Sequence, residues 1–355
     1  MTIVRHCGLD WLRIAAFALL ILYHTGMVFV PWEFHIKTAE PIDALQYPML
    51  ALNPWRLILL FVVSGYATRA LAGRSSGFGA LVGSRTLRLV VPLLFGVAVV
   101  IPLQPWIELR SAHDYTDGFW YFLINDYFRF GTLDGIVLPT WNHLWFIVYL
   151  WVYTTLLTLM LTLLPKSVRA GAQRGWNRLF GPIALLVLPI GWLLGVRMWL
   201  HPLFAETHAL FGDWAAHAVY YPAFLMGWAM AGSLSIWITL ARLRRPAIAL
   251  SLVTGLAFVG IEYAFEGETW SPTLMFIARL ARSVFAWATI IALLALADRW
   301  RDNGGPWRRT LTEAIFPFYL IHQTIIVGAQ YAIQPLRMGA LVEFSIVASA
   351  TVLGC

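Results

Sequence analysis

The stretch "LDWLRIAAFALLILYHTG", residues 9–26, indicates the fold class because it is long and apolar enough to cross a bilayer. A transmembrane helix needs about 20 predominantly apolar residues. This stretch nevertheless carries Asp10, Arg13 and His24. A charge at membrane depth is costly, so such residues usually face a partner or a watery cavity. The segment predicts a membrane helix whose polar residues need an explanation.

The composition of the whole chain agrees with this interpretation. Of 355 residues, 60% are hydrophobic, 15% are aromatic and only 12% are charged, whereas soluble domains carry about 25% charged residues. The 18 tryptophans suit aromatic belts at two membrane interfaces. We therefore expect one transmembrane domain over residues 1–355, without an appended soluble domain. The last apolar run reaches Cys355 with no polar tail, so we expect the natural chain to continue.

Further apolar runs follow the first at spacings typical of a polytopic membrane protein. The sequence predicts an all-α helix bundle with about ten transmembrane helices, each about 20 residues long. The expected spans are 10–30, 53–72, 86–108, 142–164, 181–200, 218–238, 247–265, 272–297, 313–332 and 339–355.

Charge alternates between successive loops. One set is basic and contains residues such as Arg74, Arg174, Arg244 and Arg301, and the other is rich in aspartate and glutamate. By the positive-inside rule the basic loops are cytoplasmic, and the N-terminus with Arg5 lies on the same side. The net charge of +7 is therefore explained by topology and gives no reason to expect nucleic acid. The two cysteines indicate no disulfide framework, and no metal site is expected.

The first helix places Arg13 and His24 on one face. They are eleven residues apart, which is about three helical turns and about 16 Å. Asp10 is three residues before Arg13, within reach of an ion pair. Two interpretations stay open: the two residues form a functional face, or Arg13 extends to the interface while His24 is a hydrogen-bonded packing residue.

Other polar residues interrupt later spans. Ser64, Gly65 and Tyr66 lie in the second, His143 and Trp145 open the fourth, and Tyr319 and His322 lie in the ninth. A glycine inside a membrane helix permits close approach of another backbone or of a ligand. Each set suits helix packing or the lining of a substrate path.

Two arginine pairs also have two interpretations each. Arg85 and Arg88, one turn apart at the cytoplasmic start of the third span, are either topology anchors or ligands for the phosphates of a nucleotide-like donor. Arg279 and Arg282 share a face of the eighth span. Glu262, in the seventh span, could neutralise one of them. They are either part of a structural ion pair or substrate-facing residues.

Five motifs occur in the order typical of one family: "LDWLRIAAFALLILYH", "FVVSGY", "RTLRLVVP", "HLWFIVYLWVY" and "FPFYLIHQ". Together they resemble the acyltransferase-3 family of membrane-bound acyltransferases, over about residues 8–330. Arg13 and His24 match its first-helix signature of an arginine, ten residues and a histidine. "HLWF" and "YLIHQ" look closest to the branch containing the glucan biosynthesis protein C, which succinylates periplasmic glucans. The glutamate found near a Trp-Ser-Leu motif in many polysaccharide O-acetylases is missing from "HLWFIVYL", so their substrates are not carried over.

The resemblance implies transfer of an acetyl or succinyl group from cytoplasmic acyl-CoA to a hydroxyl of an extracytoplasmic glycan or lipid-linked sugar. His24 would be the catalytic base or the acyl carrier, because a histidine titrates in the useful range. Asp10 and Arg13, also counted as catalytic, would fix the inner end of the same helix, with Arg13 placed to meet the CoA or the thioester. Arg85 and Arg88 would bind acyl-CoA. The expected substrate-path residues are Ser64, Tyr66, His143, Trp145, Tyr319 and His322. Acyl-CoA is a co-substrate, with no bound cofactor, and the expected location is a bacterial-type inner (plasma) membrane.

Two other classes stay open. A secondary transporter would explain ten spans with buried arginine, histidine and glutamate, although the inverted repeats and symmetric broken helices typical of that class are not evident. A non-catalytic sensor or scaffold would make His24 replaceable. The acidic outer loops argue against a strongly anionic acceptor, because like charges repel.

Overall fold

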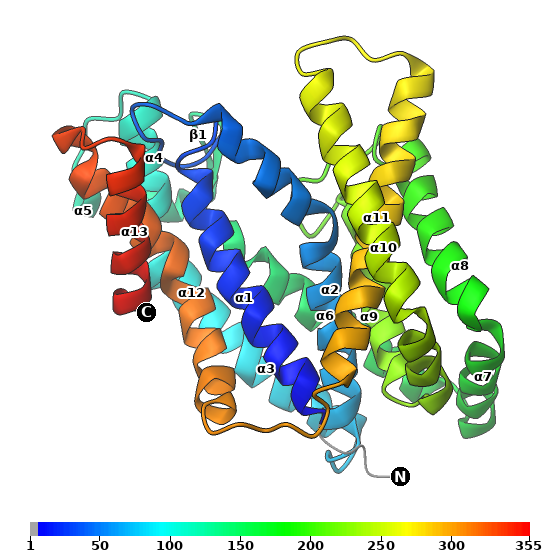
Figure 1. Ribbon diagram of the computed structural model, residues 1–355. Coiled ribbons are helices and arrows are strands. Elements are labelled where there is room, and N and C mark those ends of the chain that lie inside the picture. Colours follow the sequence, from blue (N-terminus) through cyan, green and yellow to red (C-terminus); the bar gives the residue numbers. More distant parts are fainter. Residues whose placement is uncertain (1–5) are drawn as a thin grey trace. The chain divides into compact units, whose positions relative to one another are not determined.

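A computed structural model describes residues 6–355 (Figure 1). Arg5 lies outside the described residues. In the described part the chain is helical apart from one two-stranded hairpin, so the predicted all-α class is confirmed. The main helices are α1 (Cys7–Met27), α2 (Gln46–Ala72), α3 (Phe78–Phe95), α4 (Leu103–Ala112), α6 (Trp145–Leu163), α7 (Lys166–Leu179), α8 (Pro182–Gly195), α9 (Trp214–Met230), α10 (Leu234–Ala264), α11 (Pro272–Asp298), α12 (Arg308–Ile333) and α13 (Ala340–Gly354).

Short elements connect these helices. The hairpin pairs β1 (Gly131–Leu133) with β2 (Ile136–Leu138) in antiparallel register. The helical turns are η1 (Asp43–Leu45), η2 (Gly96–Val100), α5 (Phe119–Tyr121), η3 (Phe122–Asp126), η4 (Tyr127–Arg129), η5 (Asn142–Leu144), η6 (Val196–Leu200) and η7 (Gln334–Leu336).

Eight helical segments in the described part are long and apolar enough to cross a membrane. These segments are Cys7–Met27, Asp43–Ala72, Phe78–Ala112, Asn142–Leu163, Pro182–Leu200, Leu234–Ala264, Pro272–Asp298 and Arg308–Leu336. They cover eight of the ten expected spans, and α2, α10 and α12 extend well beyond the predicted limits. The other two expected spans correspond to the shorter helices α9, of 17 residues, and α13, of 15 residues.

One predicted boundary is wrong. The expected span 218–238 ends early, because α9 stops at Met230 and α10 begins at Leu234. Ser233 is the N-cap of α10, and its hydroxyl accepts a hydrogen bond from the backbone N–H of Ile236 at 3.3 Å. Such a cap satisfies a donor that the first helical turn leaves open. The arginines around Arg244, expected in a loop, therefore lie inside α10.

By its contacts the chain divides into two compact units, each assembled from separated segments. The first contains the described residues up to Ala16, Leu50–Arg85 and Tyr149–Thr312. The second contains Phe17–Met49, Thr86–Val148 and Glu313–Cys355.

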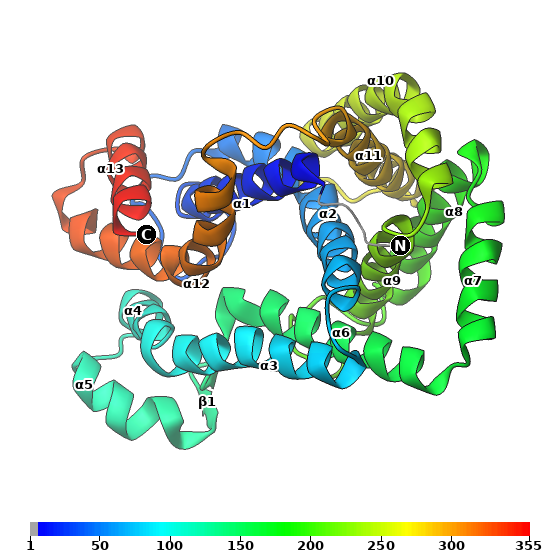
Figure 2. The same cartoon turned by 90° about the horizontal axis from the view of Figure 1, so that it is seen from below.

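In the first unit, α10 and α11 run side by side with α8 and α9 close by (Figure 2). Two glycines bring α2 and α9 into direct backbone contact. A Cβ atom at Gly65 would collide with the carbonyl oxygen of Phe224, and one at Gly227 would collide with the carbonyl oxygen of Val62. Small residues permit such close crossings in membranes. Gly65, singled out in the sequence, is therefore a packing residue.

In the second unit, the end of α1 packs on α12 and α13 through buried Val28, Phe29, Ile326 and Val347. The Lys37 ammonium group donates hydrogen bonds to the carbonyl of Met27, the last residue of α1, and to the carbonyls of Val30 and Trp32 just beyond it. Such bonds satisfy carbonyls that have no partner within the helix.

Glu343 joins α13 to the rest of the second unit. Its side chain is almost fully buried and accepts hydrogen bonds from Thr38 at 2.8 Å and from Gln330 at 2.9 Å. A buried carboxyl group needs such donors, so this contact fixes the position of α13 against α12.

We expect Gly65→Ala to lower the free energy of unfolding by roughly 1–3 kcal/mol, because the new methyl group would force α2 away from α9. Thermal unfolding of the full chain in detergent measures this. Gly191→Ala, in α8, is the control because a Cβ atom there meets nothing within 4 Å. Equal melting temperatures for the two variants would contradict the close α2–α9 crossing.

Candidate functional site

Three histidines that the sequence singled out meet in the second unit: His24 of α1, His322 of α12 and His143 of η5. The His24 Nδ1 atom lies 2.7 Å from the His322 Nε2 atom. These two rings are nearly parallel, with centroids 5.0 Å apart and an interplanar angle of 7°. The His143 ring stands nearly perpendicular to that of His322, with centroids 4.9 Å apart.

The hydrogen bonds of His322 determine where the protons of the neutral pair lie. The His322 Nδ1 atom is 2.8 Å from the carbonyl oxygen of Tyr319 and 3.1 Å from that of Phe318. A carbonyl oxygen can only accept, so His322 Nδ1 carries its proton and Nε2 is the acceptor. His24 must then donate from Nδ1, which leaves Nε2 as the basic nitrogen of neutral His24.

Burial distinguishes the members of this group. The His322 side chain is fully buried and His143 is 7% exposed, while His24 is only half-buried. His24 is therefore the member that solvent or a substrate reaches most easily, and His322 supports it from the interior.

Tyr319 and His143 brace one another. The Tyr319 hydroxyl donates to the carbonyl of His143, and His143 Nε2 donates to the carbonyls of Tyr319 and Leu320 at 3.1 and 3.3 Å. These contacts fix η5 against α12. Within residues 6–355 no three histidine, cysteine or acidic residues are placed to hold a metal ion, and the expectation of no metal stays a prediction.

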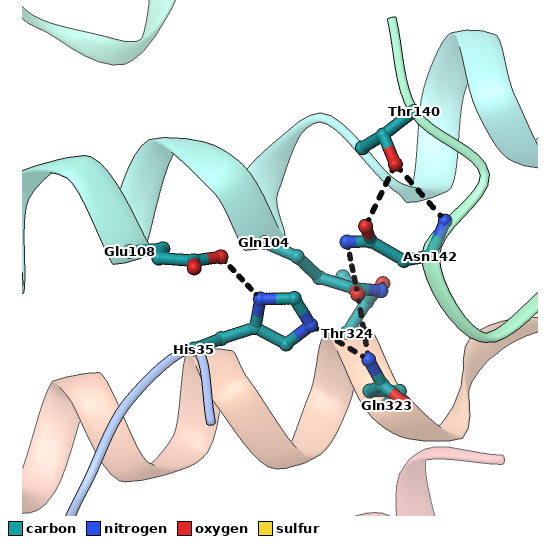
Figure 3. Close-up of polar contacts among 7 residues, drawn as sticks. All are labelled: His35, Gln104, Glu108, Thr140, Asn142, Gln323 and Thr324. Atoms are coloured by element: carbon teal, nitrogen blue, oxygen red, sulfur yellow. Dashed lines mark hydrogen bonds and ion pairs between the residues drawn. The ribbon is translucent and has the colours of Figure 1, made fainter. Parts of the chain in front are cut away.

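A network of amide side chains joins α12 at Gln323 and Thr324, the two residues that follow His322 in the sequence (Figure 3). Gln104, in α4, is fully buried, and its Oε1 atom accepts hydrogen bonds from Asn142 at 2.9 Å and from Gln323 at 3.0 Å. Its Nε2 atom donates to Thr324 at 2.6 Å. The Asn142 amide oxygen accepts from Thr140 at 2.9 Å. The network joins α4, α12 and the segment before α6, and so helps to fix α12, which carries His322.

An acid–histidine pair forms the outer part of this network (Figure 3). His35 Nδ1 lies 2.5 Å from the Glu108 carboxylate, and His35 Nε2 lies 2.9 Å from the Gln323 amide nitrogen. Because an amide N–H₂ group donates, His35 Nε2 accepts and Nδ1 donates to Glu108. His35, Gln104 and Glu108 were not identified from the sequence. The signal for Gln104 was an amide inside the apolar run 86–108.

Several predicted residues belong to the first unit. Asp10 accepts a hydrogen bond at 2.5 Å from Arg308, which begins α12. Asp10 therefore forms an ion pair with Arg308, which is 298 positions away in the sequence. The expected pairing of Asp10 with Arg13 stays a prediction. Arg13 is half-buried on the same helix.

The remaining predicted residues differ in exposure. Arg85 donates a hydrogen bond to the Thr68 hydroxyl at 2.7 Å, while Arg88 is exposed one turn later on α3. Ser64 is half-buried. Tyr66 packs edge-on against His6 and Trp237, with centroids 6.0 and 5.8 Å apart. Trp145, in the second unit, is 7% exposed at the start of α6.

Within residues 6–355, eight helical segments are long and apolar enough to cross a membrane, and the second unit holds a group of three histidines. These two features are typical of a polytopic membrane enzyme. Comparison with known protein families identifies the family to which the chain belongs. Residues 8–355 match the acyltransferase-3 family, described as an acyltransferase domain, and the chain belongs to that family. No curated protein and no solved structure matches the chain significantly. The protein is therefore a multi-pass membrane acyltransferase.

We expect Gln104→Leu to destabilise the second unit by roughly 1–3 kcal/mol for each amide left without its partner, because Asn142 and Gln323 would lose a buried acceptor. The melting temperature of the full chain in detergent is the measurement. Asn125→Leu removes an amide of an exposed residue whose side chain donates only to the Tyr121 carbonyl, and it serves as the control. A Gln104→Leu protein as stable as the control would show that the network is dispensable.

Proposed function

We propose that this acyltransferase moves an acetyl or succinyl group from acyl-CoA on the cytoplasmic side to a hydroxyl of a glycan or lipid-linked sugar on the other side. The observation that carries the proposal is the hydrogen-bond chain from the Tyr319 carbonyl through His322 to His24. This chain makes Nε2 the basic nitrogen of His24, and a basic imidazole nitrogen can accept the proton of an acceptor hydroxyl.

In the direct version of the reaction, His24 Nε2 takes the proton of the acceptor hydroxyl as its oxygen attacks the thioester carbonyl. The new C–O bond forms, the C–S bond breaks, and the CoA thiolate recovers the proton. His322 stabilises the transient imidazolium, because its Nε2 atom continues to accept from His24 Nδ1. In the second version Nε2 attacks the thioester carbonyl, the C–S bond breaks and CoA leaves as the thiolate. The acceptor hydroxyl then attacks the acyl-imidazole, the C–N bond breaks to restore neutral His24, and the hydroxyl proton passes to another base.

Basic residues of α3 and α1 suit the donor. Arg85 and Arg88 lie one turn apart on α3, and guanidinium groups bind phosphates in a forked geometry. We propose that they hold the CoA phosphates and that Arg13 meets the CoA or the thioester. The Asp10–Arg308 contact fixes the start of α1.

The orientation and the branch of the family are part of the same proposal. The basic loops favour a cytoplasmic N-terminus in a bacterial-type inner membrane. The "HLWF" and "YLIHQ" motifs favour the glucan-succinylating branch. Family membership favours acyl transfer over the secondary transporter and the non-catalytic sensor that the sequence left open.

We expect His24→Ala to reduce acylation by about 10²–10⁴-fold, the usual contribution of a positioned base, or completely if His24 carries the acyl group. Mass spectrometry of periplasmic glycans from cells making each protein would detect the added acyl mass. His113→Ala replaces an exposed histidine and is the control. Normal acylation by His24→Ala protein that is inserted in the membrane would disprove the assignment.

The role of His322 is tested by two variants, one that keeps a hydrogen-bond acceptor for His24 and one that does not. In His322→Gln the amide oxygen can still accept from His24 Nδ1, whereas His322→Leu offers no acceptor. We expect the glutamine variant to keep a measurable part of kcat and the leucine variant to lose at least about tenfold more, with similar KM for acyl-CoA. Equal kcat values for the two variants would mean that His322 only fills space.

A further inference from the structure

The first unit contains a group of charged residues that the proposed reaction does not use. We call it the arginine cluster, and its members come from five segments that are distant in sequence. They are Arg56 (α2), Arg197 (η6), Arg279 and Arg282 (α11), Glu206 (connection 201–213) and Glu262 (α10).

The members lie close enough to interact electrostatically. Arg282 interacts with Arg197, Glu206 and Glu262, and Arg197 interacts with Arg279. Arg56 interacts with Tyr220, whose hydroxyl donates a hydrogen bond to Glu206 at 2.6 Å. The expected partnership of Glu262 with the arginines of α11 is thus part of a larger group.

Three of the arginines lack oxygen acceptors within residues 6–355. Arg279 donates only to the Met198 sulfur, at 3.6 Å, and thioether sulfur is a weak acceptor. The Arg282 guanidinium lies 5.4 Å from the Phe258 ring centroid and donates no hydrogen bond in this part of the chain. Arg197 likewise donates none there. Each guanidinium offers five N–H donors, so the cluster has many more donors than acceptors.

The charges of the cluster do not cancel. Four arginines are accompanied by two carboxylates, which leaves two positive charges in excess. Burial alone would raise the pKa of Glu206, but the hydrogen bond and charge of His208, the Tyr220 hydrogen bond and the Arg197 charge lower it to about 2. Glu206 is therefore already ionised. The neighbouring carboxylate of Asp213 accepts from Tyr149 and from the His208 backbone.

The depth of these arginines within their helices makes the excess of positive charge unusual. Arg56 lies ten residues into α2 and Arg282 ten residues into α11, each about 15 Å along its helix. This is about half of the hydrocarbon thickness of a bilayer. Charge at such depth normally marks a pathway for a substrate or an ion. Arg197, Arg279 and Arg282 are half-buried, so part of each side chain is accessible at the surface of the first unit.

We propose that the arginine cluster binds a phosphate group of the acyl acceptor. Phosphate offers several oxygen acceptors in a tetrahedral arrangement, and forked guanidinium donors suit it well. One dianionic phosphate would also balance the two excess charges. The link to the acceptor rests on the proposed acyl transfer, whereas phosphate binding itself does not.

The experiment measures binding without acyl transfer. The full chain, purified in detergent, is titrated with inorganic phosphate by calorimetry at constant ionic strength. We expect saturable binding that weakens about tenfold or more in Arg197→Gln and in Arg282→Gln, because each removes charge-assisted hydrogen bonds. Arg245→Gln, an exposed arginine of α10, should bind as the wild type does. No saturable binding, or equal binding by all variants, would overturn the proposal.

Two further arms identify the source of the phosphate. Succinate binding as tightly as phosphate would overturn the choice of phosphate over carboxylate. Displacement of phosphate by phosphatidylglycerol in mixed micelles would assign the site to a membrane lipid and overturn the link to the acceptor. If Arg282→Gln fails to fold, Arg282→Lys keeps the charge but not the fork and should show an intermediate loss.

A kinetic test addresses the acceptor directly. If the cluster holds the acceptor, Arg282→Gln should raise the KM for the acceptor about tenfold with little change in kcat. An unchanged KM would overturn the link to the acceptor. Absence of acylation in the wild type would instead count against the proposed function and leave the phosphate measurement valid.

Discussion

The hydrogen bond from His24 to His322 is the contact on which the proposed chemistry of this protein depends. It joins α1 to α12, which are 298 residues apart at this point. Its direction follows from the helix itself, because His322 Nδ1 reaches back to carbonyls three and four residues earlier. Those carbonyls accept only, so one backbone feature fixes the tautomers of two histidines. The apolar packing of Phe29 on Ile326 and Val347 stabilises the same pair of helices nearby.

Polar groups in the two units are satisfied in different ways. In the second unit, Asn142 and Gln323 both donate to Gln104, and Glu343 has two donors. Such a network stabilises one arrangement of the helices, because losing any member leaves a buried group unsatisfied. In the first unit, Arg279 and Arg282 have a sulfur atom and an aromatic ring as neighbours. This contrast within one protein separates residues that maintain the fold from residues suited to an external anion.

Sequence reasoning found the elements of this site that depend on local pattern. Apolar run length gave the fold class, and His24, His143 and His322 were each noticed as polar residues inside such runs. It could not place His35 beside Glu108, because the connection after α1 has no periodicity from which its path follows. The Asp10–Arg308 contact was missed for the same reason: helix spacing favoured Arg13 as the partner of Asp10, and only the fold brings in Arg308. The α9–α10 boundary was misplaced because the N-cap residue Ser233 is the last residue of the short motif "AGS", which lies inside an apolar stretch.

The acidic outer loops would repel an anionic acceptor, whereas the arginine cluster would attract it. Which interaction is stronger depends on how far each group lies from solvent. Exposed carboxylates act through water, where salt screens them beyond about 8–10 Å. Half-buried guanidiniums act at contact distance in a less polar medium, where each charge-assisted hydrogen bond counts for more. An acceptor whose phosphate is carried on a lipid would approach within the bilayer and would not need to pass the acidic loops. The sequence argument against an anionic acceptor therefore holds for a free, highly charged glycan and leaves a lipid-linked sugar phosphate as the acceptor that both features permit.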